Sequence, residues 1–253
     1  MGNRSVDLFV GFRALALDEN LTINQNVTAQ QTGSISLQFP GVGQGQQTNN
    51  QGYYAIPAGQ TVTVIDAFST RNRFYGAQAG GRFAWDFGRL TVDLTGKVAV
   101  GATQQEVSIN GISSATSGFL GNNPPVANLV TPGGVFALQN NSGTFLQNQF
   151  TIVPEIGLNI GYALTSWLNL RMGYSALYSS SVARPGGQID PVLNSKLIPT
   201  GAFFPFQFTG SGRTVPLAPG AFGPGLEQGR PYFAFHDTAF WAHGINFGVE
   251  MRY

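Results

Sequence analysis

The chain has 253 residues, only 10% of them charged, and a formal net charge of +1 at pH 7. This balance excludes a nucleic-acid-binding protein, which needs a basic surface, and the absence of cysteine excludes disulfides and thiolate metal sites. The sequence has no run of about 18 or more apolar residues, and therefore no candidate transmembrane helix. Low charge at a mean hydropathy of +0.01 fits a β-barrel, whose alternating strands average out in any hydropathy window.

The first residues, Met1 to Arg4, lead straight into a strand pattern without an apolar signal segment. The chain would then be either a mature form with an added start or a barrel that lacks its N-terminal part. We expect the second, an N-terminally truncated barrel.

Six stretches alternate apolar with polar or small residues over lengths that exceed those of ordinary globular strands. Successive side chains of a strand point to opposite faces, so each stretch has one apolar face, as a tilted membrane-spanning strand requires. In chain order the predicted strands are 5–27, 62–87, 90–109, 145–164, 167–182 and 235–253.

The connections between these strands alternate between short and long. Gly88-Arg89 and Thr165-Ser166 form tight turns, whereas three long loops are rich in Gly, Pro, Asn, Gln and Ser. Short turns on one rim and long loops on the other are typical of outer-membrane barrels. We therefore predict one all-β domain over residues 1–253, an antiparallel transmembrane β-barrel with short periplasmic turns and long extracellular loops. The loops lie at about 28–61, 110–143 and 183–235.

Strand number is the open point of this prediction, because single-chain bacterial barrels have eight or more strands and only six are visible. A missing pair could lie upstream of Met1, or in the loops as 33–39 with 52–56 or 202–208 with 213–217. Alternatively, copies of the chain could assemble as a homo-oligomer, so that no strand edge is left unpaired in lipid.

Aromatic residues recur at two heights on the apolar face. Tyr75 and Trp85 are ten residues apart on one strand, which corresponds to about 25 Å along the membrane normal. That distance matches the apolar band between the two aromatic girdles of a membrane barrel. The predicted girdle residues are Tyr75, Trp85, Phe87, Tyr162, Tyr178, Trp241 and Tyr253.

Charged residues fall on the opposite, inward face. Five acids and five bases could form ion pairs that fill a narrow barrel; the alternative is that they merely solvate a water-filled lumen. The predicted lumen network comprises Asp7, Arg13, Arg82, Asp86, Asp93, Lys97, Glu155, Arg171, Glu250 and Arg252.

Catalytic groups are sparse. His236 and Asp237 precede the last strand, and the serines at 179–181 could lie near them, but nothing in the spacing enforces a Ser/His/Asp arrangement. His243 falls on the outward face, where an interfacial role is the simpler interpretation. We predict no enzymatic activity, no metal site and no cofactor.

Several segments of the chain are distinctive: 11–23 (GFRALALDENLTI), 71–82 (RNRFYGAQAGGR), 92–111 (VDLTGKVAVGATQQEVSING), 154–162 (PEIGLNIGY), 184–190 (RPGGQID) and 235–253 (FHDTAFWAHGINFGVEMRY). In these segments the chain resembles the C-terminal part of the β-barrel porin family of outer-membrane proteins typical of planctomycetes. The resemblance covers most of the strands and little of the loops. It implies a barrel in the outer membrane of a Gram-negative bacterium, surrounded by outer-membrane lipid, and it implies no known substrate.

The C-terminus is similar to the β-signal that the barrel-assembly machinery reads: a polar residue, a glycine two positions on, and hydrophobic residues at the end. Here these are Asn246, Gly248, Met251 and Tyr253. We therefore expect this machinery to be a partner during biogenesis.

Three classes of function stay open at this point. The first is a porin-like barrel that allows limited passage of small solutes or ions, or that anchors surface loops in the membrane. The second is a non-conducting barrel for surface recognition or adhesion, whose long loops are the working part. The third is a soluble ligand-binding calyx of the lipocalin kind, with its apolar residues inside.

Overall fold

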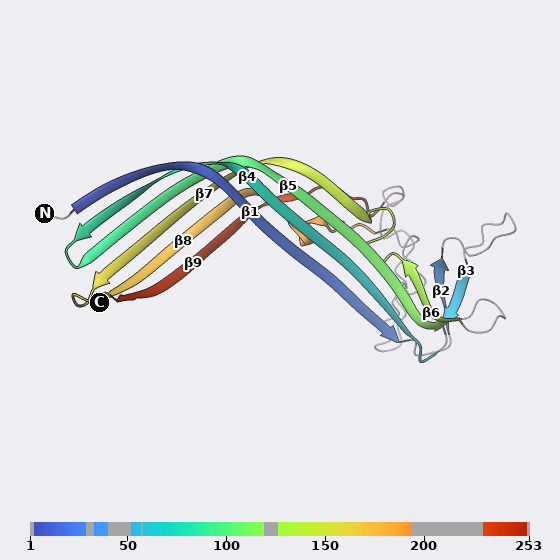
Figure 1. Ribbon diagram of the computed structural model, residues 1–253. Coiled ribbons are helices and arrows are strands. Elements are labelled where there is room, and N and C mark those ends of the chain that lie inside the picture. Colours follow the sequence, from blue (N-terminus) through green and yellow to red (C-terminus); the bar gives the residue numbers. More distant parts are fainter. Residues whose placement is uncertain are drawn as a thin grey trace.

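The computed structural model describes residues 3–28, 33–39, 52–56, 58–118, 126–193 and 230–251. Figure 1 shows these residues as long antiparallel strands that curl together. No helix in this part of the chain is long and apolar enough to cross a membrane. In chain order the elements are β1 (Asn3–Thr28), β2 (Gly33–Phe39), β3 (Gly52–Ile56), β4 (Thr61–Phe87), β5 (Leu90–Gly118), β6 (Val126–Pro132), β7 (Gly143–Ala163), β8 (Leu168–Ala183), the 3-10 helix η1 (Pro185–Gln188) and β9 (Asp237–Met251).

The main sheet has the strand order β1-β4-β5-β7-β8-β9, and β6 pairs with the far end of β5. Every pair in it is antiparallel. The six long strands form an all-β half-barrel, which confirms the predicted fold class. β1 and β9 are the two margins of this sheet.

The turn residues determine where the strands end. Gly88 has a φ of +77°, which favours glycine, and its N–H donates to Asp86 at 2.9 Å in the β4–β5 turn. In the β7–β8 turn, the Thr165 hydroxyl accepts from the Leu168 N–H at 3.0 Å. Both turns lie at the same end of the sheet as the chain termini, and β6 with the β2–β3 hairpin lies at the other end (Figure 1).

Two elements of the long connections differ from the prediction. β5 continues to Gly118, beyond residue 109, because Ala115 still pairs with Val62 of β4. The segments 33–39 and 52–56 pair with each other, but as a separate two-stranded sheet that adds no strand to the barrel wall. The other suggested pair, 202–208 with 213–217, lies outside the described residues.

The outer face of the sheet is apolar at the short-turn end. Directly paired residues share a face, and Trp85, Val92 and Ile160 face one another across β4, β5 and β7. Outward apolar side chains at the short-turn end are unusually exposed to solvent, for example Leu8 at 83% and Val10 at 86%. The band covers residues 75–87, 90–102 and 150–162 of the central strands, or about 25–30 Å at the usual rise and tilt. That height matches a bilayer's hydrocarbon core.

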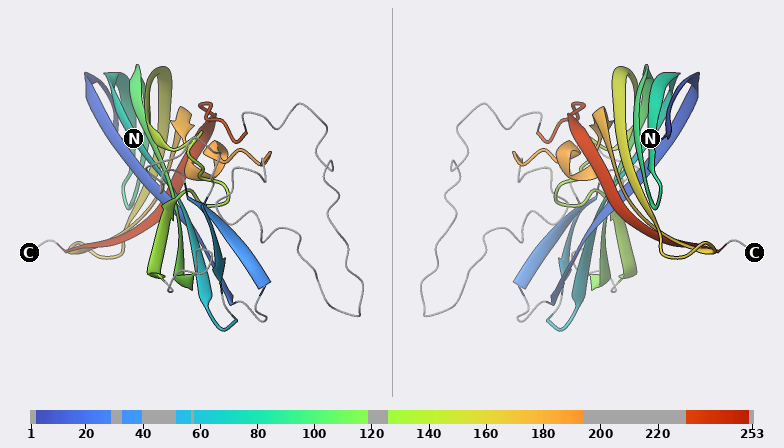
Figure 2. Two further views of the ribbon diagram at one scale, coloured as in Figure 1. Left: turned by 90° about the vertical axis from the view of Figure 1, so that its right-hand side faces the viewer. Right: turned by 90° about the vertical axis from the view of Figure 1, so that its left-hand side faces the viewer.

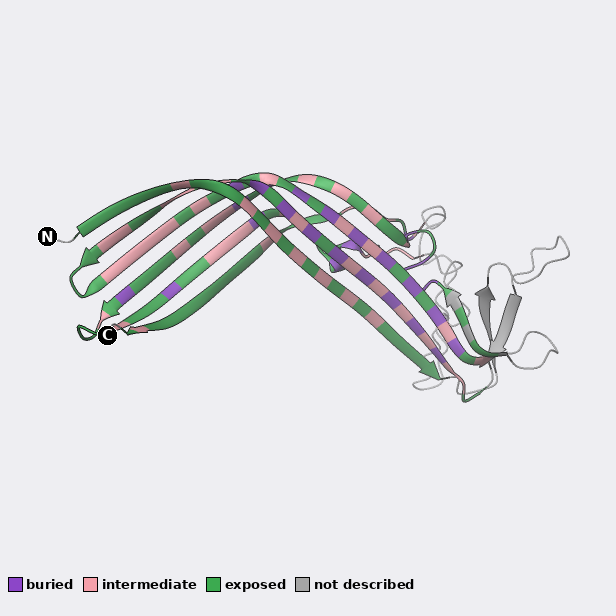
Figure 3. Ribbon diagram, viewed as in Figure 1, coloured by how far each residue is buried: buried purple, intermediate pink, exposed green. Residues whose placement is uncertain are grey.

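The inner face divides into two halves. At the short-turn end it carries charged residues. At the long-loop end it is packed around an apolar cluster, with Phe68, Val107 and Ile109 almost fully buried. Figure 3 shows these buried positions alternating along β4 and β5 toward the loop end. The inner face at this end differs from a solvated polar interior, because inward positions of the upper strands combine large apolar residues such as Phe68 with buried polar ones such as Asp66 and Asn72.

Candidate functional site

Three connecting segments fold back onto the concave face at the long-loop end. They are residues 133–142, 184–193 and 230–236, and we call them together the plug. Figure 2 shows the η1 segment and the chain before β9 gathered beside the curled sheet. Plug residues Phe136, Ile189 and Phe233 pack on the buried cluster formed around Phe68. The plug thus completes a hydrophobic core inside the barrel.

Asp66 holds the first plug segment. Its Oδ1 accepts hydrogen bonds from the backbone N–H groups of Val135, Phe136 and Ala137 at 3.0, 3.0 and 2.7 Å. The carboxylate is buried, and this cradle of N–H groups compensates its lost hydration. The approach is so close that a Cβ on Gly134 would lie 2.0 Å from Asp66 Oδ1. Only glycine fits there without a shift of the segment.

Two side-chain amides each bond to one backbone residue as a neighbouring strand would: Asn72 to Ala183, the last residue of β8 before the plug, and Gln188 to His236, in another plug segment. Asn72 donates to the Ala183 carbonyl at 2.9 Å and accepts from its N–H at 2.8 Å. Gln188 donates to the His236 carbonyl at 2.8 Å and accepts from its N–H at 3.3 Å. Each amide therefore satisfies both polar groups of one backbone residue, as buried backbone requires.

Ion pairs complete the attachment of the plug. Asp190 accepts from Arg230 at 2.7 Å and from the Tyr232 N–H at 3.1 Å, joining two plug segments. Burial alone would raise the pKa of the Asp190 carboxyl, but Arg230 and the backbone donors hold it below its ordinary value. Arg184 forms a bidentate pair with Glu19 at 2.6 and 3.0 Å, which ties the plug to β1.

Below the plug, at the level of the apolar band, charged side chains cross the concave face. Glu155 of β7 pairs with Arg13 of β1 at 2.5 Å and with Lys97 of β5 at 2.9 Å. The Arg13 and Glu155 side chains are only 15% and 20% exposed. Arg13 also donates to Gln78 at 3.0 Å. A second apolar cluster of Phe74, Ala99 and Val153, joined by Leu15 and Leu177, separates this group from the plug.

The predicted charged set divides into separate groups. Arg82 pairs with Asp93 at 2.6 Å and Arg171 with Glu250 at 2.6 Å, besides the group around Glu155. Within the described residues, Asp7 and Asp86 take part in no salt bridge, and the Asp86 carboxylate instead accepts from the turn residue Gly88. Arg252 lies outside the described residues.

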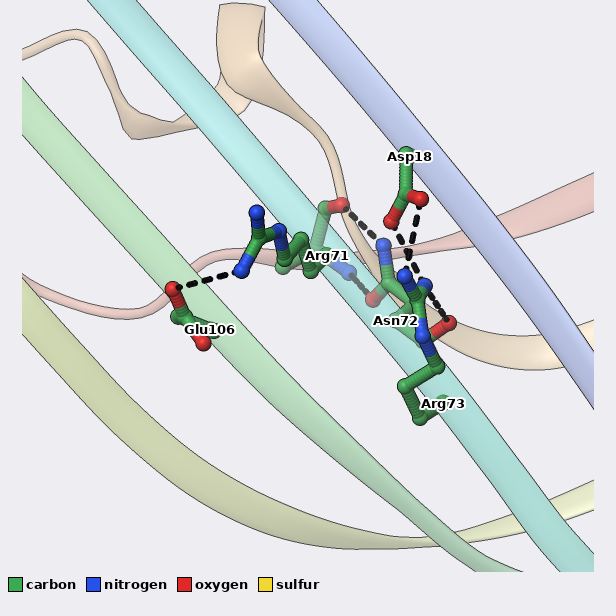
Figure 4. Close-up of polar contacts among 6 residues, drawn as sticks. Asp18, Arg71, Asn72, Arg73 and Glu106 are labelled. Carbon is green, nitrogen blue, oxygen red and sulfur yellow. Dashed lines mark hydrogen bonds and ion pairs between the residues drawn. The ribbon is translucent and has the colours of Figure 1, made fainter.

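Charged residues on the outer face, outside the predicted lumen set, form a further group. Arg73 forms a bidentate pair with Asp18 at 2.5 and 2.8 Å, and Arg71 lies 3.7 Å from Glu106 (Figure 4). These residues lie on the same outward face of the sheet as Tyr75, and they are the next residues beyond the apolar band toward the long loops. The alternation pattern could have revealed them, because outward charges on consecutive strands mark the upper limit of a lipid-facing surface.

The predicted girdle residues lie on the outer face wherever they are described. Tyr162 pairs with Leu90 near the short turns. Trp241 is 67% exposed, and its ring centroid lies 4.6 Å from that of Tyr178. Their role as two interfacial girdles stays a prediction. The placed residues are Tyr75, Trp85, Phe87, Tyr162, Tyr178 and Trp241, and Tyr253 lies outside the described part.

The terminal pattern lies on the marginal strand β9. Asn246 and Gly248 face inward opposite Gly173 and Arg171, while Met251 points outward opposite Leu168. This placement leaves the signal residues on an edge that another protein can approach, although their role in assembly stays a prediction.

We expect the double substitution Met251→Ala with Tyr253→Ala to lower the amount of protein inserted in cells more than it lowers stability in detergent. Both changes remove apolar groups from the terminal pattern but leave the strand's hydrogen-bonding groups in place. Surface-exposed protein on intact cells would be compared with thermal unfolding of the refolded variants. Equal outer-membrane levels for variant and wild type would refute a signal function.

The histidine region contains no assembled catalytic triad in the part of the chain that is described. Ser181 lies 2.9 Å from an Asp237 oxygen, but no hydrogen bond joins the His236 ring to either residue. His243 lies on the outer face, with its ring 6.2 Å from that of Tyr174. No group of three or more His, Cys, Asp or Glu residues in these ranges could hold a metal ion.

An antiparallel sheet that is apolar outside over the thickness of a bilayer, with charged residues inside, is the wall of a transmembrane β-barrel. The model of the putative beta barrel porin-7 family matches residues 1–253, and the chain belongs to this family. The resemblance to β-barrel porins is thereby confirmed, and the soluble calyx is the wrong alternative. No curated protein and no solved structure matches the chain.

Proposed function

We propose that the chain is a porin-like barrel of the outer membrane whose lumen is closed to bulky solutes and passes only small ions. The observation that carries this proposal is the packed core within the barrel. Phe68, Val107 and Ile109 face inward and are covered by plug residues, and this packing supports a lumen that is narrowed at that level. Interiors packed in this way contain few voids as large as a water molecule.

The lower half of the barrel supports a narrow lumen. Arg13 extends from β1 to Glu155 on β7, over two intervening strands, so the ion pair crosses the concave face of the curled sheet. Balanced charges of both signs line this region, which favours weak ion selectivity. A solute that entered from the short-turn end would meet first these pairs and then the apolar layer around Phe74.

Current through single molecules in a planar bilayer, combined with the swelling of liposomes in sugars of increasing size, tests this proposal. We expect small, brief conductance steps and no uptake of sugars by liposomes that contain the wild-type protein. Large stable pores with rapid sugar uptake would contradict an occluded lumen and favour an open general porin.

A second candidate, a non-conducting barrel for surface display, is favoured by how far the strands extend. β4 and β5 continue beyond the outward charged residues Arg73 and Glu106 to Thr61 and Gly118. At about 3.3 Å per residue these ends rise roughly 30 Å above the membrane surface. Complete absence of current, with correctly folded protein, would favour this candidate.

A further inference from the structure

A cavity of about 220 Å³ lies on the concave face, at the level of the apolar cluster around Phe74 and just below the plug. β1, β4, β5, β8 and β9 all contribute to its lining. The apolar lining residues include Leu15, Leu17, Phe74, Leu177, Val182 and Phe240. Contacts across the concave face hold these walls together, because Leu15 of β1 and Leu177 of β8 both pack on the cluster that contains Phe74.

The cavity offers two hydroxyl groups and no charge. None of the described residues that line it is charged. Thr103 and Ser179 are buried, at 1% and 6% exposure. The Thr103 hydroxyl donates to Thr151 Oγ1 at 2.7 Å, so its own oxygen can still accept a hydrogen bond. The Ser179 hydroxyl bonds to no described residue, and it can both donate and accept. A ligand with one hydroxyl group would therefore meet polar atoms that the fold leaves available.

We propose that this cavity binds a small neutral aromatic alcohol, a molecule of the phenol class. Its size suits a single ring, because a cavity of about 150 Å³ lined by Leu, Ile and Phe accommodates benzene, and the additional space here admits a short substituent. The apolar walls favour a hydrocarbon ring, and Phe74 and Phe240 offer aromatic surface to it. An ionised ligand would have no charged partner among the described lining residues, and burying an unpaired charge is costly.

The inference rests on the proposed function, because it assigns a ligand to the same narrowed lumen. Asn72 lines the cavity and also holds Ala183, the last residue of β8 before the plug. A bound ring therefore lies beside the residue that fixes the base of the plug. A ligand that binds only the folded barrel raises the free energy of unfolding. The ligand should accordingly raise the midpoint of thermal unfolding in detergent.

Fluorine NMR of 4-fluorophenol, added to the protein refolded in detergent, tests this assignment. Partition into micelles rises with ligand concentration without saturating, whereas binding in the cavity saturates at one ligand per chain. Fluorobenzene, which lacks the hydroxyl group, and 4-fluorobenzoate, which is charged at neutral pH, are titrated in parallel. Ala242→Leu fills the cavity from β9. The matched control, Ala176→Leu, adds the same side chain on the outer face of β8, where Ala176 pairs with Ile156.

We expect saturable binding of 4-fluorophenol by the wild-type protein and by Ala176→Leu, weaker binding of fluorobenzene, and no binding of 4-fluorobenzoate. Ala242→Leu should abolish binding of both neutral probes. Ser179→Ala should lower the affinity for 4-fluorophenol about three- to tenfold, the usual contribution of one hydrogen bond. It should leave the affinity for fluorobenzene unchanged, which a general loosening of the cavity would not.

Absence of saturable binding of 4-fluorophenol, or equal affinities for 4-fluorophenol and fluorobenzene, would overturn the inference. So would unchanged binding by Ala242→Leu when its circular dichroism matches that of the wild-type protein. If Ala242→Leu does not fold, the comparison of Ser179→Ala with the wild-type protein decides in its place. Binding is measured without current, so a large open pore in a protein that binds 4-fluorophenol would contradict the proposed function alone. A barrel of small conductance that binds no 4-fluorophenol would contradict this inference alone.

Discussion

Replacing Asp66 by alanine is expected to raise the conductance of the barrel several-fold. The substitution removes the acceptor of three backbone N–H groups at Val135, Phe136 and Ala137, which lie within the protein core. Each buried donor left without a partner costs about 1–3 kcal/mol, so the first plug segment should detach from the inner face. Single-channel current in a planar bilayer measures the effect.

Asp66→Asn is the matched control for this experiment. All three N–H groups donate to Oδ1, which an asparagine retains at the same position, and only the second bond of Val135, to Oδ2 at 3.1 Å, is lost. We therefore expect a conductance near the wild-type value, with a smaller loss of stability. Wild-type current in the alanine variant, with the fold intact, would show that the plug does not close the lumen.

Replacing Glu155 by alanine is expected to destabilise the barrel by about 3 kcal/mol, because it leaves two cations without their partner in a partly buried position. Arg13 and Lys97 both pair with this carboxylate. The loss should lower the midpoint of thermal unfolding in detergent. It should also increase current slightly, since the two freed side chains can separate.

Asp18→Ala provides the comparison, because its pair with Arg73 is on the outer face and largely exposed. Exposed pairs contribute little to stability, because solvent screens the attraction and ordering two side chains costs entropy. Similar unfolding midpoints for the two variants would mean that the inward group around Glu155 has no special role.

The strands could be predicted because their signal is local. The predicted second strand, 62–87, differs from β4 by one residue, since period-two alternation leads directly into the turn at Gly88. The hairpin of β2 and β3 follows from alternation between turn residues in the same way. The end of β5 was missed because its last residues are small and polar, and only their pairing with β4 and β6 identifies them as strand.

Contacts between distant segments could not be predicted. Asp66 and Asn72 look like ordinary inward polar residues of an alternating strand, and nothing nearby in sequence indicates that they bind residues 135–137 and Ala183. The partners in the ion pairs could not be predicted either, because they depend on the strand register and on which neighbour each side chain reaches. Arg82 is directly opposite Asp7 on β1, yet it pairs with Asp93.

The electrophoretic mobility of unboiled protein, read together with its circular dichroism in detergent, tests the membrane barrel most directly. A closed barrel resists unfolding by detergent, so the unboiled sample should migrate differently from the boiled one and show a β-sheet spectrum. Identical mobility in both lanes with a helical spectrum, or a protein that stays monodisperse in buffer without detergent, would contradict the account.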